Sequence, residues 1–406
     1  MLLRDSKLNT EDYMYLERYV NDGSPSGFTD VYTTSSGTRP KDSTTSFSLC
    51  SVKFPNHFTF HEFGEEPDFF KKFDMLVHPD MIKNSFFSEC RDIDCNALLV
   101  SPTSSARTVK ATGEDGWFIK LHYDGLIGRF PRQIHVNNAQ SAVEVSGIIS
   151  KAIDGRQLPD FLYLMREKFA RVIVAQSSDV TGEWGIVLRE PHPYGLRSSD
   201  LFPLPGFSLF ASDDKNPNQI PILIQLFTAQ EKNISDFLLQ DLFFPLLDVY
   251  FSLLLVCGLE LEAQAQNINF LIDRNLRIRG IAIKDMESVD KDLSLIQDLN
   301  IKTLPVERTW KSLKKDQYNY QIMHSFMFDF KMGEYLVSPI ISKALQQYNF
   351  ESAPLIKRLK EHSEMYLKQL PKDFFPSDGR WYSYEKIVHD RAKKRTYISN
   401  PNPKYR

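Results

Sequence analysis

The sequence is poor in cysteine, with Cys50, Cys90, Cys95 and Cys257 as its only four in 406 residues. Four cysteines in so long a chain do not make the disulfide framework of a small secreted domain. Cys90 and Cys95 lie close together, but no second pair of Cys or His residues completes the spacing of a zinc site. We therefore expect reduced and mostly buried thiols.

The sequence also lacks a strong net charge and a long apolar run. Its formal net charge of −3 provides no general attraction for nucleic acid or anionic lipid. The N-terminus has no apolar core of a signal peptide. The most apolar stretch, residues 243–259, is short for a bilayer and is interrupted by Pro245 and Asp248, so it predicts a buried core helix. These features predict a cytoplasmic protein with no nucleic-acid partner and no membrane partner.

The composition that is present, 42% hydrophobic and 25% charged, is that of an ordinary globular protein. The chain exceeds the size of a single hydrophobic core, so two or three sub-domains are expected. Short β-type runs such as ALLVSP and WFIKLHY dominate from about 97 to 220, around one helix at 139–153. From 220 onward, apolar residues recur at helical spacing, apart from two short strands around a turn at 273–275.

The pattern therefore predicts an α+β fold in three regions. These are an N-terminal region at 1–95, a β-rich domain at 96–219 with a phosphate-contacting turn, and a mostly helical domain at 220–406. Within the first region we expect a helix in residues 1–20, a loop at 23–46, a strand at 47–60 and a short helix at 67–73.

A first group of candidate functional residues surrounds the segment PTSSARTVKA at 102–111. Ser105, Arg107 and Thr108 lie in a hydroxyl-rich turn, and such turns offer side-chain and backbone donors to phosphate oxygens. Lys120 and Arg132 follow later in the sequence, at separations that predict positions on neighbouring strands. Three cations on adjacent strands repel one another unless an anion lies among them, which favours a polyanion site. The alternative is three solvated charges on one face of a sheet.

A second group lies between 260 and 287, where a buried helix leads into two strands with polar residues at their ends. Amide and carboxylate oxygens such as those of Asn267 and Asp285 are ligands that Mg²⁺ prefers. Gln266 is also too polar to be buried without a partner. The alternative is a polar helix end and a β-turn. His78–Pro79, with the later Lys83, is a third and weaker candidate, since a His beside Pro is often a packing residue.

These pieces occur in an order that resembles the NRPS-independent siderophore (NIS) synthetases of the aerobactin synthetase type. That family has a His-Pro motif with a later Lys, a Ser-x-Arg-Thr turn, a strand Lys, a downstream Arg, a His-x-Gln-Asn motif and an Arg-Asp motif. The corresponding residues here are His78–Pro79, Ser105 to Thr108, Lys120, Arg132, Gln264 to Asn267 and Lys284–Asp285. GIVLREPH at 185–192 and YISNPNP at 397–403 are also similar to family segments.

The sequence departs from the family at several points. Gln264 stands where the family has His, and Lys284 stands where it has Arg. A second His-Pro is missing, and the chain is shorter than expected for the family. Because Gln cannot carry a positive charge, we expect a preference for an acid with fewer carboxylates than citrate.

The resemblance implies a cupped-hand fold and an AMP-forming ligase, which uses ATP and Mg²⁺ to join a small carboxylic acid to an amine or hydroxyl nucleophile. A homodimer is a further expectation. The implied residues are Arg132, Lys120 and His78 for catalysis; Ser105, Arg107, Thr108, Lys120, Gln264, Gln266 and Asn267 for ATP; and Asn267, Asp285, Glu262 and Glu287 for the metal. Two alternatives are a non-catalytic nucleotide-binding scaffold and an ATP-dependent transferase with kinase-like chemistry.

Overall fold

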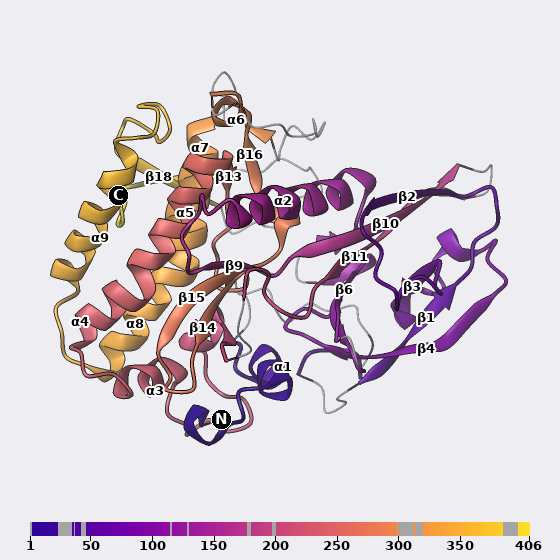
Figure 1. Cartoon of the computed structure of the whole chain (residues 1–406), viewed down its shortest axis with the longest axis horizontal. Coiled ribbons are helices and arrows are strands. Elements are labelled where there is room, and N and C mark those ends of the chain that lie inside the picture. The colour runs from indigo at the N-terminus through magenta and orange to yellow at the C-terminus, as the bar shows by residue number, and fades with distance from the viewer. Residues whose placement is uncertain are drawn as a thin grey trace.

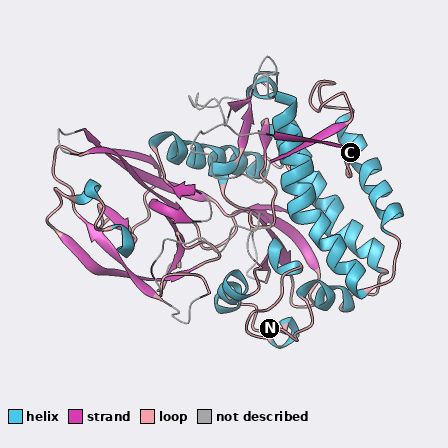
Figure 2. Ribbon diagram, turned by 180° about the vertical axis from the view of Figure 1, so that it is seen from behind, coloured by secondary structure: helices cyan, strands magenta, loops and turns pink. Residues whose placement is uncertain are grey.

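A computed structural model describes most of the chain. The residues it describes are 2–22, 35, 37–41, 46–113, 116–127, 130–176, 180–196, 200–298, 300, 312–313, 320–384 and 397–406. Figure 1 shows a β-rich half and a helical half that lie side by side, with a long helix crossing from one to the other. Figure 2 shows the same two halves from behind.

The β-rich half is built on an eight-stranded sheet in which every neighbouring pair is antiparallel. Its strands, in spatial order, are β2 (Thr59–Gly64), β10 (Glu167–Gln176), β11 (Thr181–Arg189), β6 (Phe118–Leu121), β5 (Thr108–Ala111), β4 (Ile93–Pro102), β1 (Phe47–Val52) and β3 (Met75–Val77). A separate hairpin, β7 (Tyr123–Ile127) and β8 (Phe130–Arg132), follows β6 directly. Short 3₁₀ turns, η2 (Pro79–Met81) and η3 (Ser85–Phe87), follow β3.

Both faces of this sheet are covered along β10 and β11, where most positions are buried. Along β10, Phe169 and Ile173 point into an aromatic core, because residues two or four apart share a face. Ala170 and Val172 point the other way, toward α2 (Val136–Asp154). Small residues such as Ala142 on α2 let the helix lie close to the strands.

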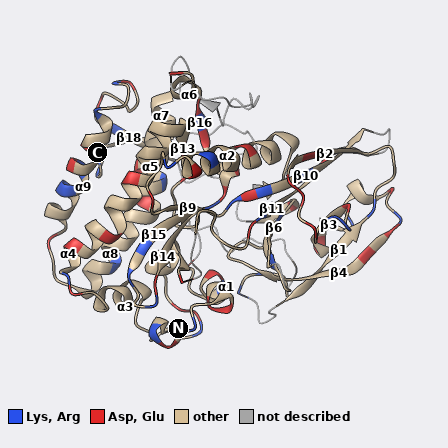
Figure 3. Cartoon of the chain, in the orientation of Figure 1, with Lys and Arg blue, Asp and Glu red and all other residues tan. Residues whose placement is uncertain are grey.

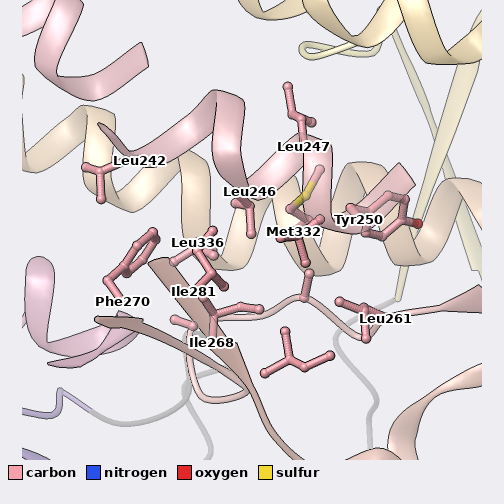
Figure 4. Packing of buried hydrophobic residues seen from close by; sticks show 14 of the residues in the cluster. Leu242, Leu246, Leu247, Tyr250, Leu261, Ile268, Phe270, Ile281, Met332 and Leu336 are labelled. Atoms are coloured by element: carbon pink, nitrogen blue, oxygen red, sulfur yellow. The ribbon is translucent and has the colours of Figure 1, made fainter. Parts of the chain in front are cut away.

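The helical half contains the largest hydrophobic core. Its helical segments are α3 (Ile222–Thr228), α4 (Ile234–Phe237), η5 (Leu238–Phe243), α5 (Phe244–Cys257), α6 (Leu293–Asp298), α7 (Tyr320–Ser325), η7 (Phe326–Val337), α8 (Ser338–Gln347) and α9 (Ser352–Leu367). Figure 4 shows the centre of the core, where Leu246 and Tyr250 of α5 pack beside Met332 of η7 and above Ile268 and Ile281 of the underlying strands. The segments η5 and η7 are π-helical.

Residues Ile234–Cys257 form a continuous helical stretch that is long and apolar enough to cross a membrane by length and composition. In the structure this stretch lies in the core, with Leu242, Val249 and Leu253 fully buried, as the sequence predicts for residues 243–259. The stretch ends at Gly258, whose φ of 63° is left-handed. A Cβ there would lie 2.5 Å from the Ile296 side chain, so both backbone angle and space require glycine.

Smaller sheets connect the two halves. The four-stranded sheet has the order β12 (Phe202–Pro205), β14 (Ile268–Ile272), β15 (Ile278–Ile283) and β9 (Leu162–Leu164). A three-stranded sheet contains β13 (Leu259–Glu260), β16 (Asp290–Asp292) and β17 (Ser312–Leu313). The N-terminal α1 (Thr10–Tyr19), preceded by η1 (Leu3–Asp5), packs against β12 and belongs to the helical core. The turns η4 (Gly206–Leu209) and η6 (Met286–Ser288) follow β12 and β15.

The α+β class is confirmed, as are the antiparallel middle sheet, the helix at 139–153 and the two strands around residues 273–275. The expected helix at 67–73 is wrong, because this stretch forms only turns. The single strand expected at 47–60 is two strands, β1 and β2, which lie far apart in the sheet. The expected boundary at 95/96 runs through β4. Most of the expected loop at 23–46 lies outside the described residues.

The expectation of reduced thiols is wrong for Cys50 and Cys95, which form a disulfide. The cysteines are 45 residues apart in sequence, but β1 and β4 are paired, and a register shift lies beside Cys50. Strand pairing therefore creates a proximity that sequence spacing does not show. Cys90 and Cys257 are free and buried, as expected.

Candidate active site

A cluster of charged side chains lies where the eight-stranded sheet meets the loop after β15. At its centre is Lys120, in the middle of β6, between Thr108 of β5 and Val187 of β11. Its ammonium contacts Asp285 in a short ion pair and lies 2.8 Å from the Glu287 carboxylate. Burial lowers the pKa of Lys120, but the two carboxylates outweigh burial and raise it, so Lys120 is charged.

Arg107 supplies a second cation beside Lys120. It ends the hydroxyl-rich turn, and its guanidinium donates to the Arg132 carbonyl at 2.9 Å. Another of its nitrogens lies 3.8 Å from Glu287. The turn itself is closed by Thr103, whose hydroxyl donates to the Thr108 carbonyl at 2.8 Å. Arg107, at the end of this closed turn, and Lys120 of β6 thus both reach the Glu287 carboxylate.

Asp285 and Glu287 come from one sharp turn at residues 285–287, the acidic turn. Asp285 follows β15 with a left-handed backbone, φ 71° and ψ 61°, and caps η6, which contains Glu287. Burial opposes ionisation of Glu287, but Lys120 and Arg107 outweigh it and lower its pKa to about 2. Lys120 and Arg189 likewise lower the pKa of Asp285 against the effect of burial. Both carboxylates are therefore ionised at neutral pH.

Side chains from other segments hold the acidic turn in place. Asn138, near the start of α2, donates to Glu287 through a short hydrogen bond. The Glu167 carboxylate accepts from the backbone N–H of Met286 at 3.1 Å and from Arg189 at 2.8 Å. Figure 3 shows acidic and basic segments side by side at the start of β10, where the two halves of the molecule meet. Arg189 lies in the GIVLREPH segment, whereas Asn138 and Glu167 belong to none of the segments that suggested the site.

The expected Gln264–Asn267 motif lies beside this turn. Asn267 is buried, and its amide donates to the Glu262 carbonyl at 3.0 Å and to the Ser288 hydroxyl at 3.3 Å. The same hydroxyl donates to the Asp285 carbonyl at 2.7 Å, so Ser288 links Asn267 to the acidic turn. Gln264 and Gln266 are half-buried, and in the described part of the chain their side chains form no hydrogen bond.

Four carboxylate and amide side chains were expected to bind a metal. The structure brings Asp285 and Glu287 together on Lys120 and links Asn267 to them through Ser288. Glu262 is instead 2.5 Å from Lys331 of η7. Among the described residues, no three His, Cys, Asp or Glu side chains form a cluster suited to a metal ion. The oxygen donors are nevertheless of the kind that Mg²⁺ prefers, and phosphate oxygens complete such sites.

Of the two other expected catalytic residues, Arg132 touches the cluster through its carbonyl, and His78 packs outside it. Arg132 is exposed, and its Nε donates to the Ile127 carbonyl at 3.2 Å. His78 is fully buried between the rings of Phe47 and Tyr123. Burial lowers its pKa to about 4, so its ring is neutral, and its Nδ1 accepts from the Asp80 backbone N–H. A catalytic role for His78 would require its loop to open.

Ser105 and Thr108 occupy the turn as expected, both half-buried. A further residue that the sequence did not reveal is Glu17 of α1. Its carboxylate accepts from the Ser104 backbone N–H in the hydroxyl-rich turn and from the Lys284 ammonium. The available signal was an acidic residue within an otherwise apolar face of the first helix, with Tyr13 and Leu16 buried beside it.

No protein-family model and no curated protein matches the sequence. Solved structures do match the fold. The petrobactin biosynthesis protein AsbB from Bacillus anthracis str. Sterne matches with a TM-score of 0.71 and 17% identity, over 97% of this chain and 75% of that one.

Two proteins from a hypervirulent pathotype of Klebsiella pneumoniae have similar folds. Aerobactin synthetase IucC matches with a TM-score of 0.67 and 16% identity, over 92% of this chain and 72% of its own. ATP-bound aerobactin synthetase IucA matches at 0.64 and 13%, over 90% and 71%. The fold expected from the motif order is therefore confirmed. At these identities the likeness establishes the fold alone.

Proposed function

We propose that this chain is an ATP-dependent ligase. It joins a small carboxylic acid to an amine or a hydroxyl through an acyl-adenylate, in the biosynthesis of a siderophore or a related natural product. The observation that carries the proposal is the convergence of Arg107 and Lys120 with Asp285 and Glu287 at one place in the fold. The fold is that of AsbB and the aerobactin synthetases, one of which was solved with ATP bound. We place the reaction in the cytoplasm, where ATP is available.

The charges suit attack on a polyphosphate. In the first step a carboxylate oxygen of the acid bonds to the α-phosphorus of ATP, and the bond to the bridging oxygen breaks, so that pyrophosphate leaves. In the second step the amine or hydroxyl attacks the acyl carbon, loses a proton, and AMP leaves. Both steps need charge neutralisation and alignment more than a nucleophilic side chain. Arg107 and Lys120 supply the cations, and Arg132 lies at the edge of the same site.

The acidic turn suits a divalent cation. We assign Asp285 and Glu287 to Mg²⁺, with Asn267 and Glu262 beside them, because all four offer oxygen donors. When bound, Mg²⁺ would neutralise phosphate charge. The chain's own part is to hold both carboxylates ionised, which Lys120 does by lowering their pKa values, and to orient Asp285 through its left-handed backbone.

The test is to measure the products formed from ATP. The purified chain, MgATP and a panel of mono-, di- and tricarboxylic acids are incubated with hydroxylamine, and pyrophosphate, AMP and the hydroxamate are quantified. The proposal requires all three products in equal amounts with at least one acid. Formation of ADP and phosphate instead would contradict the ligase and indicate the kinase-like transferase.

One observation favours a second candidate, a nucleotide-binding protein without catalysis. The position that resembles the family's His is Gln264, and the position that resembles its Arg is Lys284, whose ammonium binds Glu17 rather than the acidic turn. Gln264 carries no charge, and the charge of Lys284 is compensated by Glu17, so neither position offers an uncompensated positive charge to an acid with several carboxylates. ATP binding in calorimetry, with no hydroxamate from any acid, would establish this second candidate.

A further inference from the structure

Helix α1 carries a buried carboxylate that touches both parts of the candidate site. Glu17 is 1% exposed. Its Oε2 accepts from the backbone N–H of Ser104, in the hydroxyl-rich turn, at 3.1 Å. Its Oε1 accepts from the Lys284 ammonium at 2.6 Å and from the Tyr13 hydroxyl at 2.7 Å. One carboxylate thus joins segments that are 87 and 267 residues away in sequence.

The two segments that Glu17 joins are the ones that carry the site. Ser104 lies three residues before Arg107, in the turn closed by Thr103. Lys284 lies directly before Asp285, and its backbone N–H donates to the Asn267 carbonyl at 2.9 Å. Any shift of the turn relative to the end of β15 would alter how Arg107 faces the acidic turn. Glu17 restrains this shift, because it bonds to both segments.

The contact between Glu17 and Lys284 depends on the charges of both side chains. Glu17 and Lys284 are 1% and 8% exposed, so neither ion has enough water to be stable alone. Burial opposes ionisation of Glu17, but Lys284 outweighs it and keeps the carboxyl pKa below its ordinary value. Removing one partner of a buried pair leaves the other uncompensated, whereas removing both is far less disruptive.

We propose that Glu17 is a positioning residue of the nucleotide site, which clamps the Ser104 turn to the Lys284 end of β15 so that Arg107 and Asp285 face the same phosphates. The inference rests on the proposed function in one respect, that the site binds ATP. It makes α1 part of the site, although no residue of α1 belongs to the nucleotide motifs. It also gives Lys284 a role different from contact with substrate.

The test compares four proteins: native, Glu17→Gln, Lys284→Met and the double variant. Glutamine keeps the shape of Glu17 but removes its charge. We expect each single variant to raise the dissociation constant of MgATP by about tenfold, measured by calorimetry well below the unfolding temperature. Because the two residues act as one unit, the double variant should also show about tenfold rather than the roughly hundredfold of independent sites.

A second readout needs no nucleotide. Hydrogen exchange in the peptide covering residues 103–108 should be faster in Glu17→Gln than in the native protein, because the Ser104 amide loses a charged acceptor. The matched control is Asp329→Asn, which removes another buried carboxylate, paired with Arg406 at 2.9 Å in the helical half. This control should lower the unfolding temperature without changing either exchange at 103–108 or the MgATP dissociation constant.

The outcomes separate the two proposals. Native affinity for MgATP in Glu17→Gln, or unchanged exchange at 103–108, overturns the clamp while leaving the ligase standing. Failure of the native chain to bind MgATP overturns the proposed function, and the exchange comparison still decides whether Glu17 holds the turn. If Glu17→Gln does not fold, the double variant takes its place, since it leaves no unpaired buried charge. Native affinity in the double variant then refutes the clamp.

Discussion

Replacing Lys120 by Met would test the charge network at its centre. Methionine keeps much of the side-chain length and removes the ammonium that binds Asp285 and Glu287. Breaking a buried ion pair by deleting one partner costs about 3–5 kcal/mol. The Asp285 side chain is 29% exposed and can recover some water, so we expect about 3 kcal/mol of lost unfolding free energy near neutral pH.

The lowered pKa of Glu287 points to an effect in the same direction. A folded-state value of about 2 against an ordinary 4.5 corresponds to about 3 kcal/mol of stabilisation at neutral pH. Lys120 and Arg107 share in producing that shift, and Asp285 adds a further contribution from Lys120.

The sign of the pH dependence follows from the direction of these shifts. A carboxyl whose folded pKa is lowered contributes stability above its unfolded pKa, and this contribution is lost as pH falls through the folded value. The variant lacks this contribution at neutral pH. The difference between native and variant should therefore be largest at about pH 7 and shrink steadily below about pH 4.5.

Urea unfolding of both proteins across this range provides the measurement. The control is Lys110→Met on the neighbouring strand β5, because the Lys110 ammonium lies 5.6 Å from the centre of the Phe118 ring and, among the described residues, forms no ion pair. It should cost less than about 1 kcal/mol, the limit for a cation–π contact of this kind. A Lys120→Met deficit that stays constant between about pH 7 and about pH 3 would refute the assignment of charges.

Three further substitutions test how the candidate site binds MgATP, Mg²⁺ and the carboxylic acid. Arg107→Ala should weaken MgATP binding by about 1.5–3 kcal/mol, the range for a hydrogen bond to a charged group; equal affinity in calorimetry would exclude contact with phosphate. Asp285→Asn should keep the fold, checked by circular dichroism, but lose most Mg²⁺-dependent pyrophosphate release; full activity at low Mg²⁺ would remove Asp285 from the metal site. Gln264→His should increase pyrophosphate release with citrate and decrease it with the native acid; saturation of the native protein by micromolar citrate would contradict the expected preference for fewer carboxylates.

Local sequence pattern predicted most of the elements that build the fold. The apolar alternation of β10 and β11, and the helical spacing of residues 139–153, are signals that tertiary contacts do not override. The local sequence pattern predicted the wrong element where tertiary packing determines the backbone conformation. The stretch 67–73 has the residues of a short helix but is held as turns against the aromatic core by Phe70 and Phe73. The strands β18 (Arg380–Tyr384) and β19 (Tyr397–Pro401) pair with each other, and no local hairpin signal predicted this pairing.

The candidate site was predictable as a set of residue types but not as a set of contacts. Motif order identified Arg107, Lys120 and Asp285, and the structure brings them together. Sequence separation hides the partners that hold them, because Asn138 reaches Glu287 over 149 residues. It also hides the Cys50–Cys95 disulfide, which depends on the register between β1 and β4. Such contacts are properties of the packed sheet rather than of any segment.

Under the proposed function, the arrangement of charge favours joint binding of metal and nucleotide at this site. Without ligand, Lys120 and Arg107 are neutralised by Asp285 and Glu287, so the site carries no large net charge. Phosphate alone would draw Lys120 away and leave two half-buried carboxylates facing an added anion. A cation alone would take the carboxylates and leave Lys120 unpaired in a place where it is 6% exposed. Each ligand therefore supplies the counter-charge that the other removes, and thermodynamic linkage makes the coupling reciprocal. When metal and nucleotide bind together, the phosphates pair with Lys120 and Arg107 while the metal pairs with Asp285 and Glu287. This is the physical reason to expect MgATP rather than free ATP as the species bound.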